Sequence, residues 1–212
     1  MKILALGAHP DDIEFGCGGS LLRFIREGHD VYIFVATRGE LGGDSETRKS
    51  EQEEAASYAG IKKVFWGGYE DSRLPLSKEL ISNIESVLEE INPEYIFIHY
   101  NEDTHQDHRV LAEATLSATR YVPNFLFYEG PTTVNFSPNV YIDIDREIDD
   151  KVILLKKHSS QVSKVIAGMP ELSIVDFALS TAQFRGIQGR RRTAEAFRSL
   201  RLFIDIPDAV SL

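Results

Sequence analysis

Residues 3–12 read ILALGAHPDD and contain the first predicted strand together with the polar residues that follow it. The first six residues of this stretch are apolar or small and predict a buried strand at 3–8, and four polar positions, 9–12, follow where that strand ends. A helical segment at 19–27 and a second apolar strand at 30–37 come next. A strand, a helix and a strand in this order predict a right-handed crossover between two parallel strands.

The same alternation continues through the first half of the chain. Further strands are predicted at 63–66 and 95–100, and further helices at 46–59 and 77–91. Asp44 or Ser45 can cap the first of these helices, and the second ends before Pro93. We therefore predict one Rossmann-like α/β domain over residues 1–212, with a mostly parallel sheet and helices on both faces.

The second half of the chain is less regular. Strands are predicted at 125–128 and 140–144, and a long helix at 145–167 with Asp145 as its cap. The C-terminal residues 194–206 are predicted to form a helix that runs into a last strand or strand-like tail.

The composition excludes several classes of protein. The net charge of −10 disfavours general binding to nucleic acid or to anionic membranes, although residues 189–192 (GRRR) can form a local basic patch. No apolar run is long enough to span a bilayer, and the first residues lack the features of a secretory signal. The single cysteine, Cys17, excludes an intramolecular disulfide and a cysteine-based zinc cluster. We expect a cytoplasmic protein.

Two polar clusters follow predicted strands, at residues 9–12 (HPDD) and 105–108 (HQDH). Ligands of an open parallel sheet bind outside the carboxyl ends of its strands, so both clusters are expected at one site. Imidazole and carboxylate are the ligands of zinc and related ions, and a catalytic zinc takes three of them and keeps one position open. The remaining side chains can then serve as the base and the acid of a hydrolase. Either cluster alone can equally be a helix cap or a turn.

Residues 8–12 (AHPDD), followed by 16–19 (GCGG), resemble the amino-terminal signature of the PIG-L/LmbE-like family of zinc-dependent de-N-acetylases. The similarity covers nearly the whole chain and includes residues 37–42 (TRGELG), Arg48 with Glu51, residues 105–108, His158 with Gln161, and residues 194–197 (AEAF). One departure is Gln106, where the family commonly has proline. This exchange is expected to change the stiffness of the loop rather than its chemistry.

The resemblance implies that His9, Asp12 and His108 bind the metal ion. Zinc is the expected ion, although two histidines and one carboxylate also suit Fe²⁺ or another divalent ion.

The resemblance also implies the catalytic roles. Asp11 would take a proton from the attacking water, and His105 would stabilise the developing oxyanion and protonate the leaving amine. Asp107 would orient His105 and raise its pKa.

On the substrate side, the resemblance implies that Arg48 and Asp71 hold sugar hydroxyls, and it leaves the roles of Arg38 and His158 open. The predicted reaction is removal of an N-acetyl group from an N-acetylglucosamine-like glycoside. Two alternatives are a zinc amidase for another small amide and a non-catalytic, cation-dependent sugar- or nucleotide-binding module. Family members are often multimeric, so a homo-oligomer is one expected state.

Overall fold

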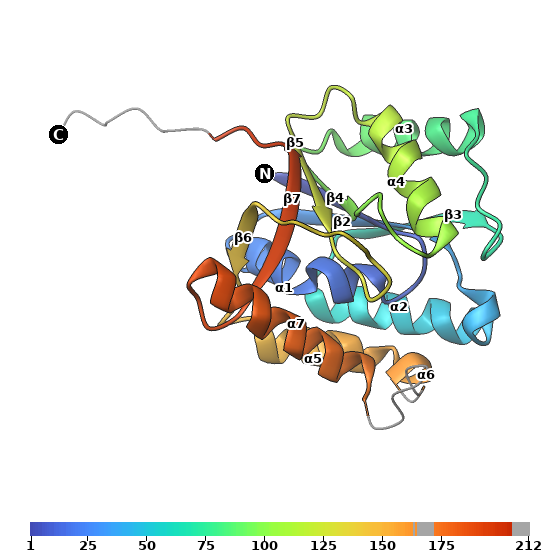
Figure 1. Ribbon diagram of the computed structural model, residues 1–212. Helices are drawn as coiled ribbons and strands as arrows, with labels where there is room; N and C mark the ends of the chain where they lie inside the picture. The colour runs from blue at the N-terminus through green and yellow to red at the C-terminus, as the bar shows by residue number, and fades with distance from the viewer. Residues whose placement is uncertain (163, 165–171, 205–212) are drawn as a thin grey trace.

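The computed structural model describes residues 1–162, 164 and 172–204, and it contains a seven-stranded sheet in the order β3-β2-β1-β4-β5-β7-β6 (Figure 1). The strands are β1 Lys2–Gly7, β2 Asp30–Thr37, β3 Lys63–Tyr69, β4 Tyr95–His99, β5 Asn124–Tyr128, β6 Val140–Asp143 and β7 Ala194–Arg201. The first five strands run parallel, whereas β7 pairs antiparallel with both β5 and β6. The prediction of an α/β domain with a mostly parallel sheet is confirmed.

Helices cover both faces of the sheet (Figure 1). They are α1 Asp12–Arg26, α2 Ser45–Ala59, α3 Lys78–Ile91, α4 Gln106–Ala118, α5 Ile148–Lys157, α6 Ser159–Val162 and α7 Ile174–Gly189, with a 3₁₀ turn, η1, at Glu40–Gly42. Alternate residues of β1 belong to different cores: Leu4 and Leu6 pack with α3 and α4, while Ile3 and Ala5 pack with α1. Helix α5 packs on α1 and α2, and α7 packs on α5, β6 and β7. No helix in the described part of the chain is both long and apolar enough to cross a membrane.

Helix α1 begins at Asp12, seven residues earlier than the sequence predicted. The cause is the glycine-rich stretch 16–19, which looks like a turn but lies within the helix. A Cβ atom on Gly16 would lie 2.1 Å from the ring of Tyr128 in the sheet. Glycine therefore allows α1 to press against the strands directly below residues 9–12.

The prediction of a helix at 194–206 is wrong. Residues Ala194–Arg201 form β7, inserted between β5 and β6. The buried carboxylate of Glu195 accepts hydrogen bonds from the backbone of Gly19 and Ser20 in α1 and pairs with the buried Lys151 of α5. These contacts and the strand pairing override the helix propensity of an Ala-Glu-Ala sequence. Residues 205–206 lie outside the described residues.

The long helix predicted at 145–167 is also wrong in its extent. Helix α5 begins after Glu147 and ends at Lys157, His158 breaks the helical path, and the short α6 follows. Asp145 does not cap α5; its carboxylate accepts hydrogen bonds from the backbone and hydroxyl of Thr193. Residues 163 and 165–167 lie outside the described residues. Helices α4 and α7 were not predicted.

Candidate active site

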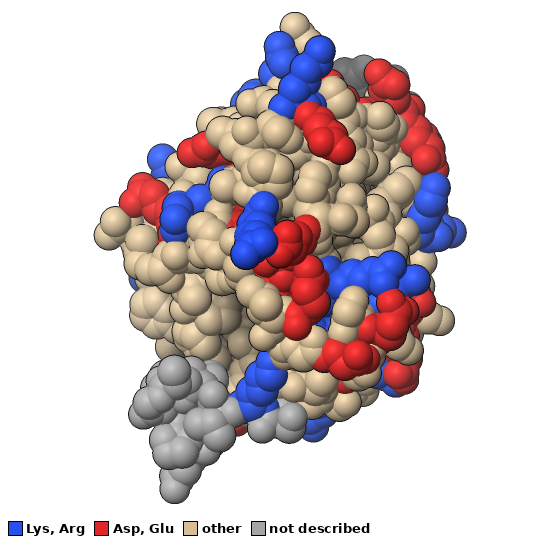
Figure 2. All heavy atoms as spheres, turned by 90° about the vertical axis from the view of Figure 1, so that its right-hand side faces the viewer, with Lys and Arg blue, Asp and Glu red and all other residues tan. Residues whose placement is uncertain are grey.

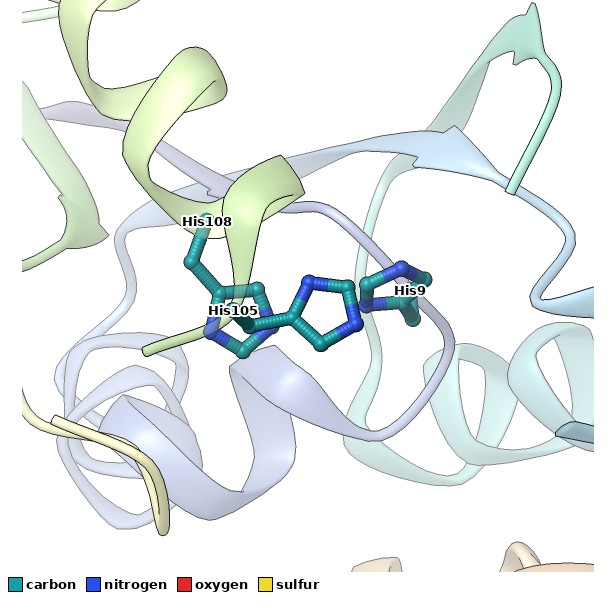
Figure 3. A group of neighbouring side chains, drawn as sticks. All are labelled: His9, His105 and His108. Atoms are coloured by element: carbon teal, nitrogen blue, oxygen red, sulfur yellow. The ribbon is translucent and has the colours of Figure 1, made fainter. Parts of the chain in front are cut away.

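A cavity of about 360 Å³ opens at the carboxyl ends of the parallel strands. Seven of the eight predicted site residues line it: His9, Asp11, Asp12, Arg48, Asp71, His105 and His108. The eighth, Asp107, is fully buried. The rings of His9, His105 and His108 lie close together, with His9 from the loop after β1 and His108 from the first turn of α4 (Figure 3).

Asp12 lies between the two histidines predicted to be its fellow ligands. Its Oδ2 is 3.3 Å from His9 Nδ1, and its Oδ1 is 3.5 Å from His108 Nε2. Tetrahedral ligand atoms about 2.0–2.1 Å from a zinc ion are roughly 3.3 Å from one another. The Asp12 carboxylate thus presents one oxygen to each histidine at about this spacing. His9, His105 and His108 have nitrogens that lie within 4.8 Å of one another, and Asp12, His99 and His108 form a second group of this kind. These side chains together form a candidate site for a divalent ion.

The outer nitrogens of both histidines face carboxylates. His9 Nε2 lies 3.2 Å from Asp107 Oδ2 and 3.1 Å from Asp71 Oδ1. His108 Nδ1 lies 3.3 Å from Asp103 Oδ2. Metal-binding histidines are commonly oriented in this way by a carboxylate on the second ring nitrogen. This arrangement directs His9 Nδ1 and His108 Nε2 toward Asp12.

Asp107 does not orient His105, contrary to the sequence prediction. Its carboxylate accepts hydrogen bonds from the backbone of Ser72 (2.7 Å) and Leu74 (3.2 Å) and contacts His9. His105 caps α4 instead, with its Nδ1 accepting from the backbone N–H of Asp107 at 3.3 Å. Asp107 is the second residue of α4, and its carboxylate points to the loop between β3 and α3 and to His9.

The charge of Asp107 does raise the pKa of His105, as predicted, but larger opposing effects outweigh it. Burial and the positive charges of His108 and His9 lower the pKa of His105 below its ordinary value of 6.5. Its Nδ1 is occupied as an acceptor, so the neutral ring carries its proton on Nε2. His105 is therefore a neutral hydrogen-bond donor at the cavity rather than a fixed cation.

The carboxylates around His9 and His108 favour a positive charge at this position. Burial opposes a charge on His9, but hydrogen bonds with Asp107, Asp12 and Asp71 raise its pKa to about 12. Burial also opposes a charge on His108, yet Asp12 and Asp103 raise its pKa to about 9. Protons on these rings balance the surrounding carboxylates, and a divalent ion can replace them.

His99, at the end of β4, is a further histidine close to Asp12. It stacks on His108, and its Nε2 lies 3.2 Å from Asp12 Oδ2. The same nitrogen lies 3.2 Å from the backbone N–H of Ala8, which donates to it. This contact occupies the nitrogen that would otherwise bind a metal. His99 therefore packs against His108 as a supporting residue.

Asp11 adopts the left-handed region, with φ 92°, immediately before α1. Such a conformation costs a non-glycine residue of the order of 1–3 kcal/mol and often marks a functional position. Burial and the negative charge of Asp12 raise the pKa of Asp11 to about 6, against the opposing effects of His158 and Arg48. A carboxylate with this pKa is suited to general base catalysis near neutral pH.

Arg48 and Asp71 line the cavity, but most of their polar atoms are already engaged. Arg48 donates to the carbonyls of Gly39 (2.7 Å) and Pro10 (2.8 Å), and lies 3.5 Å from Asp11 Oδ1. Gly39 has φ 65°, and a Cβ atom there would lie 1.9 Å from the Arg48 guanidinium. Arg48 therefore holds the loops after β1 and β2 in place, in addition to lining the cavity.

Asp71 accepts a hydrogen bond from the backbone of Leu41 at 2.9 Å, in addition to its contact with His9. It thereby joins η1 to the loop after β1. Arg38 pairs with Glu46 at the surface and does not line the cavity.

Sequence reasoning missed four buried polar residues around the site: Asp103, His99, Gln52 and Glu14. Asp103 joins His108 to the cavity wall, because it also accepts from the hydroxyls of Thr132 (2.6 Å) and Thr133 (2.9 Å). Asp103 and His99 could have been found from their positions, because His99 ends a strand and Asp103 follows that strand. Gln52 and Glu14 gave no signal, because their contact joins two helices far apart in sequence.

His158 lies 1% exposed behind Asp11, with its Nε2 3.6 Å from Glu14 Oε2. It does not line the cavity, whereas Gln161, three residues later, does. Pro131 and Thr132, within the 121–139 stretch of the chain, also line the cavity. On the molecular face shown in Figure 2, acidic and basic groups are interspersed, and no continuous basic surface covers its described residues.

The chain is similar to known proteins over most of its length. Residues 4–119 match the sequence model of the PIG-L family, described as GlcNAc-PI de-N-acetylase. The chain is 35% identical to the "uncharacterized deacetylase YaiS" of Escherichia coli K12, over 74% of this chain and 90% of that protein. It is 26% identical to the diacetylchitobiose deacetylase of Thermococcus kodakarensis, over 93% of this chain and 82% of that protein.

The fold comparison gives the same relationship. The conserved protein TT1542 of Thermus thermophilus superimposes with a TM-score of 0.83 at 26% identity, over 98% of both chains. With more than half of its length matched by the family model, the chain belongs to the PIG-L family and is a deacetylase, an enzyme that hydrolyses an amide bond.

Proposed function

We propose that this protein is a zinc-dependent hydrolase that removes the N-acetyl group from an N-acetylglucosamine-like glycoside. The observation that carries the proposal is the place of Asp12 between His9 and His108, with the spare carboxylate of Asp11 on the same cavity. A purely binding site needs the ligands but has no need of a strained aspartate with a raised pKa beside them. The family description and the chitobiose-deacetylase relative support an amino sugar as the substrate class.

His9, Asp12 and His108 would hold the ion. When bound, zinc supplies a Lewis acid that polarises the amide carbonyl and makes water more acidic. Fe²⁺ or another divalent ion is an alternative outcome of metal analysis. The outer carboxylates Asp107 and Asp103 would keep the two imidazoles oriented.

The protein's own side chains would move the proton. Asp11 takes a proton from the attacking water as the water oxygen bonds to the carbonyl carbon. His105 donates a hydrogen bond from Nε2 to the carbonyl oxygen as negative charge develops there. Asp11 then delivers its proton to the nitrogen as the C–N bond breaks, and the products are acetate and a free amine. Arg48 and Asp71 are proposed to hold sugar hydroxyls with the donor and acceptor positions that remain free.

The test is acetate and amine release from zinc-loaded protein. The substrates are N-acetylglucosamine, N,N′-diacetylchitobiose and N-acetylglycine, which lacks the sugar. We expect release from at least one sugar and little from N-acetylglycine. Preferred hydrolysis of N-acetylglycine would favour an amidase of different scope, and bound zinc without hydrolysis of any amide would favour a binding module.

A matched pair of variants tests the ligand assignment. His108→Ala should lose both zinc and activity. His29→Ala should keep both, because His29 lies beside the N-terminus at the amino end of β2. Retention of one zinc per chain by His108→Ala would contradict the assignment.

A further inference from the structure

One peptide unit, between Pro10 and Asp11, is held at both ends by side chains of α2. Arg48 Nη2 donates to the carbonyl oxygen of Pro10 at 2.8 Å. The backbone N–H of Asp11 donates to Gln52 Oε1 at 3.3 Å. Arg48 and Gln52 are four residues apart and so lie on the same face of the helix. A single helix face therefore binds both polar groups of this peptide.

Holding this peptide fixes an unfavourable backbone conformation. Asp11 has φ 92°, a region that residues other than glycine rarely adopt. Rotation of the peptide plane changes ψ of Pro10 and φ of Asp11 together. A contact at each end of the plane therefore resists the rotation that would relax Asp11.

The amide of Gln52 is itself oriented by a second buried residue. Gln52 Nε2 donates to Glu14 Oε1 at 2.6 Å. A carboxylate oxygen accepts, so the amide nitrogen faces Glu14 and the amide oxygen faces Asp11. Gln52 is fully buried and Glu14 is 2% exposed, so water does not compete for these contacts. The second oxygen of Glu14 faces His158, with 3.6 Å to its Nε2.

We propose that Gln52 and Glu14 are positioning residues that hold the Pro10–Asp11 peptide and thereby aim the Asp11 carboxylate into the cavity. The inference rests on the proposed role of Asp11 as the base. Gln52 does not line the cavity, and its contacts with the site pass through the backbone of Asp11. It therefore acts on the geometry of the base and not on substrate or metal directly.

The test compares Gln52→Met with Glu53→Met. Methionine has nearly the shape of glutamine but cannot accept the Asp11 N–H, and Glu53 is an exposed neighbour on the same helix. Loss of one hydrogen bond should speed hydrogen exchange at the Asp11 amide by about threefold or more, as measured by NMR. Misplacement of the base should lower kcat by about tenfold or more. KM, zinc stoichiometry and exchange in the sheet should match the control.

A second variant covers the case in which Gln52→Met does not fold. Glu14→Gln keeps the size of the side chain but allows the Gln52 amide to turn over, so exchange at Asp11 and kcat should change in the same directions, by less. Unchanged exchange at Asp11 in a folded variant, or a kcat equal to that of Glu53→Met, would overturn the inference. A fall in kcat that accompanies loss of zinc would overturn it as well.

The exchange measurement needs no substrate. If the protein hydrolyses none of the acetylated sugars, the proposed function fails while faster exchange in Gln52→Met still reports the contact. If hydrolysis occurs and exchange does not change, the inference fails alone.

Discussion

Replacing Asp11 by asparagine should lower turnover by about a hundredfold or more and at the same time stabilise the metal-free protein. The substitution keeps the shape of the side chain, and asparagine tolerates the left-handed backbone at this position. It removes the proton acceptor, and loss of a general base lowers kcat by about 10²–10⁴-fold. Zinc should remain bound, because Asp11 is not among the proposed ligands.

The gain in stability follows from the pKa of Asp11. Burial and the charge of Asp12 raise it from 3.8 to about 6. Each unit corresponds to about 1.4 kcal/mol, so an unscreened shift of this size costs the folded state roughly 3 kcal/mol above pH 6. About a fifth of the side chain remains exposed to solvent. Screening reduces the effect, and we expect asparagine to stabilise the protein by about 1–2 kcal/mol at pH 7.5.

Urea unfolding of the chelated proteins between pH 3.5 and 8 measures this difference. A carboxyl whose pKa is raised by folding destabilises the native state only where it ionises. The two proteins should therefore be equally stable below about pH 4, diverge between pH 4 and 6, and differ fully above pH 6. Asp30→Asn, at an exposed ion pair with Lys62, serves as the control. An Asp11→Asn protein that is less stable than the parent at pH 7.5, or one that retains full activity, would refute the reasoning.

Three further outcomes follow from the same contacts. Zinc binding at pH 8 should release close to two protons, because His9 and His108 have pKa values of about 12 and 9 before the ion binds. Calorimetry in buffers of different ionisation enthalpy measures the number of protons released. Release of none would contradict the prediction. Asp103→Asn should weaken zinc binding about 10–100-fold, because His108 loses the carboxylate that orients it. Competition with a chelator measures the affinity, and an unchanged affinity would contradict this role. Lys151→Met should cost about 3–5 kcal/mol in urea unfolding, because it leaves Glu195 buried without its cation; a loss below about 1 kcal/mol would argue against a buried ion pair.

The sequence predicted the parallel half of the fold because each of its elements carries a local pattern. The apolar strand at 95–100 and the one-sided helix at 77–91 need no distant partner to be recognised, and both occur within two residues of the predicted bounds. Residues 194–201 have no such local pattern. Their strand conformation depends on pairing with β5 and β6 and on the contact between Glu195 and Lys151, which sequence periodicity does not contain.

The candidate site divides in the same way. The two clusters that supply His9 and His108 follow strands that become neighbours in the sheet, so their meeting could be predicted from topology. The orientation of Asp107 could not, because it depends on which way the first turn of α4 faces and on the backbone of Ser72. The support of Asp11 by Gln52 was hidden for a similar reason, since it requires the packing of α2 against the loop after β1.

Metal dependence is measured by titrating the metal-free protein with zinc and following acetate release from N,N′-diacetylchitobiose. Activity should rise from near zero to a plateau at one zinc per chain, and Asp11→Asn should bind the same equivalent with strongly reduced activity. Hydrolysis that persists in the chelated protein, or a plateau at a different stoichiometry, would contradict the proposed zinc dependence.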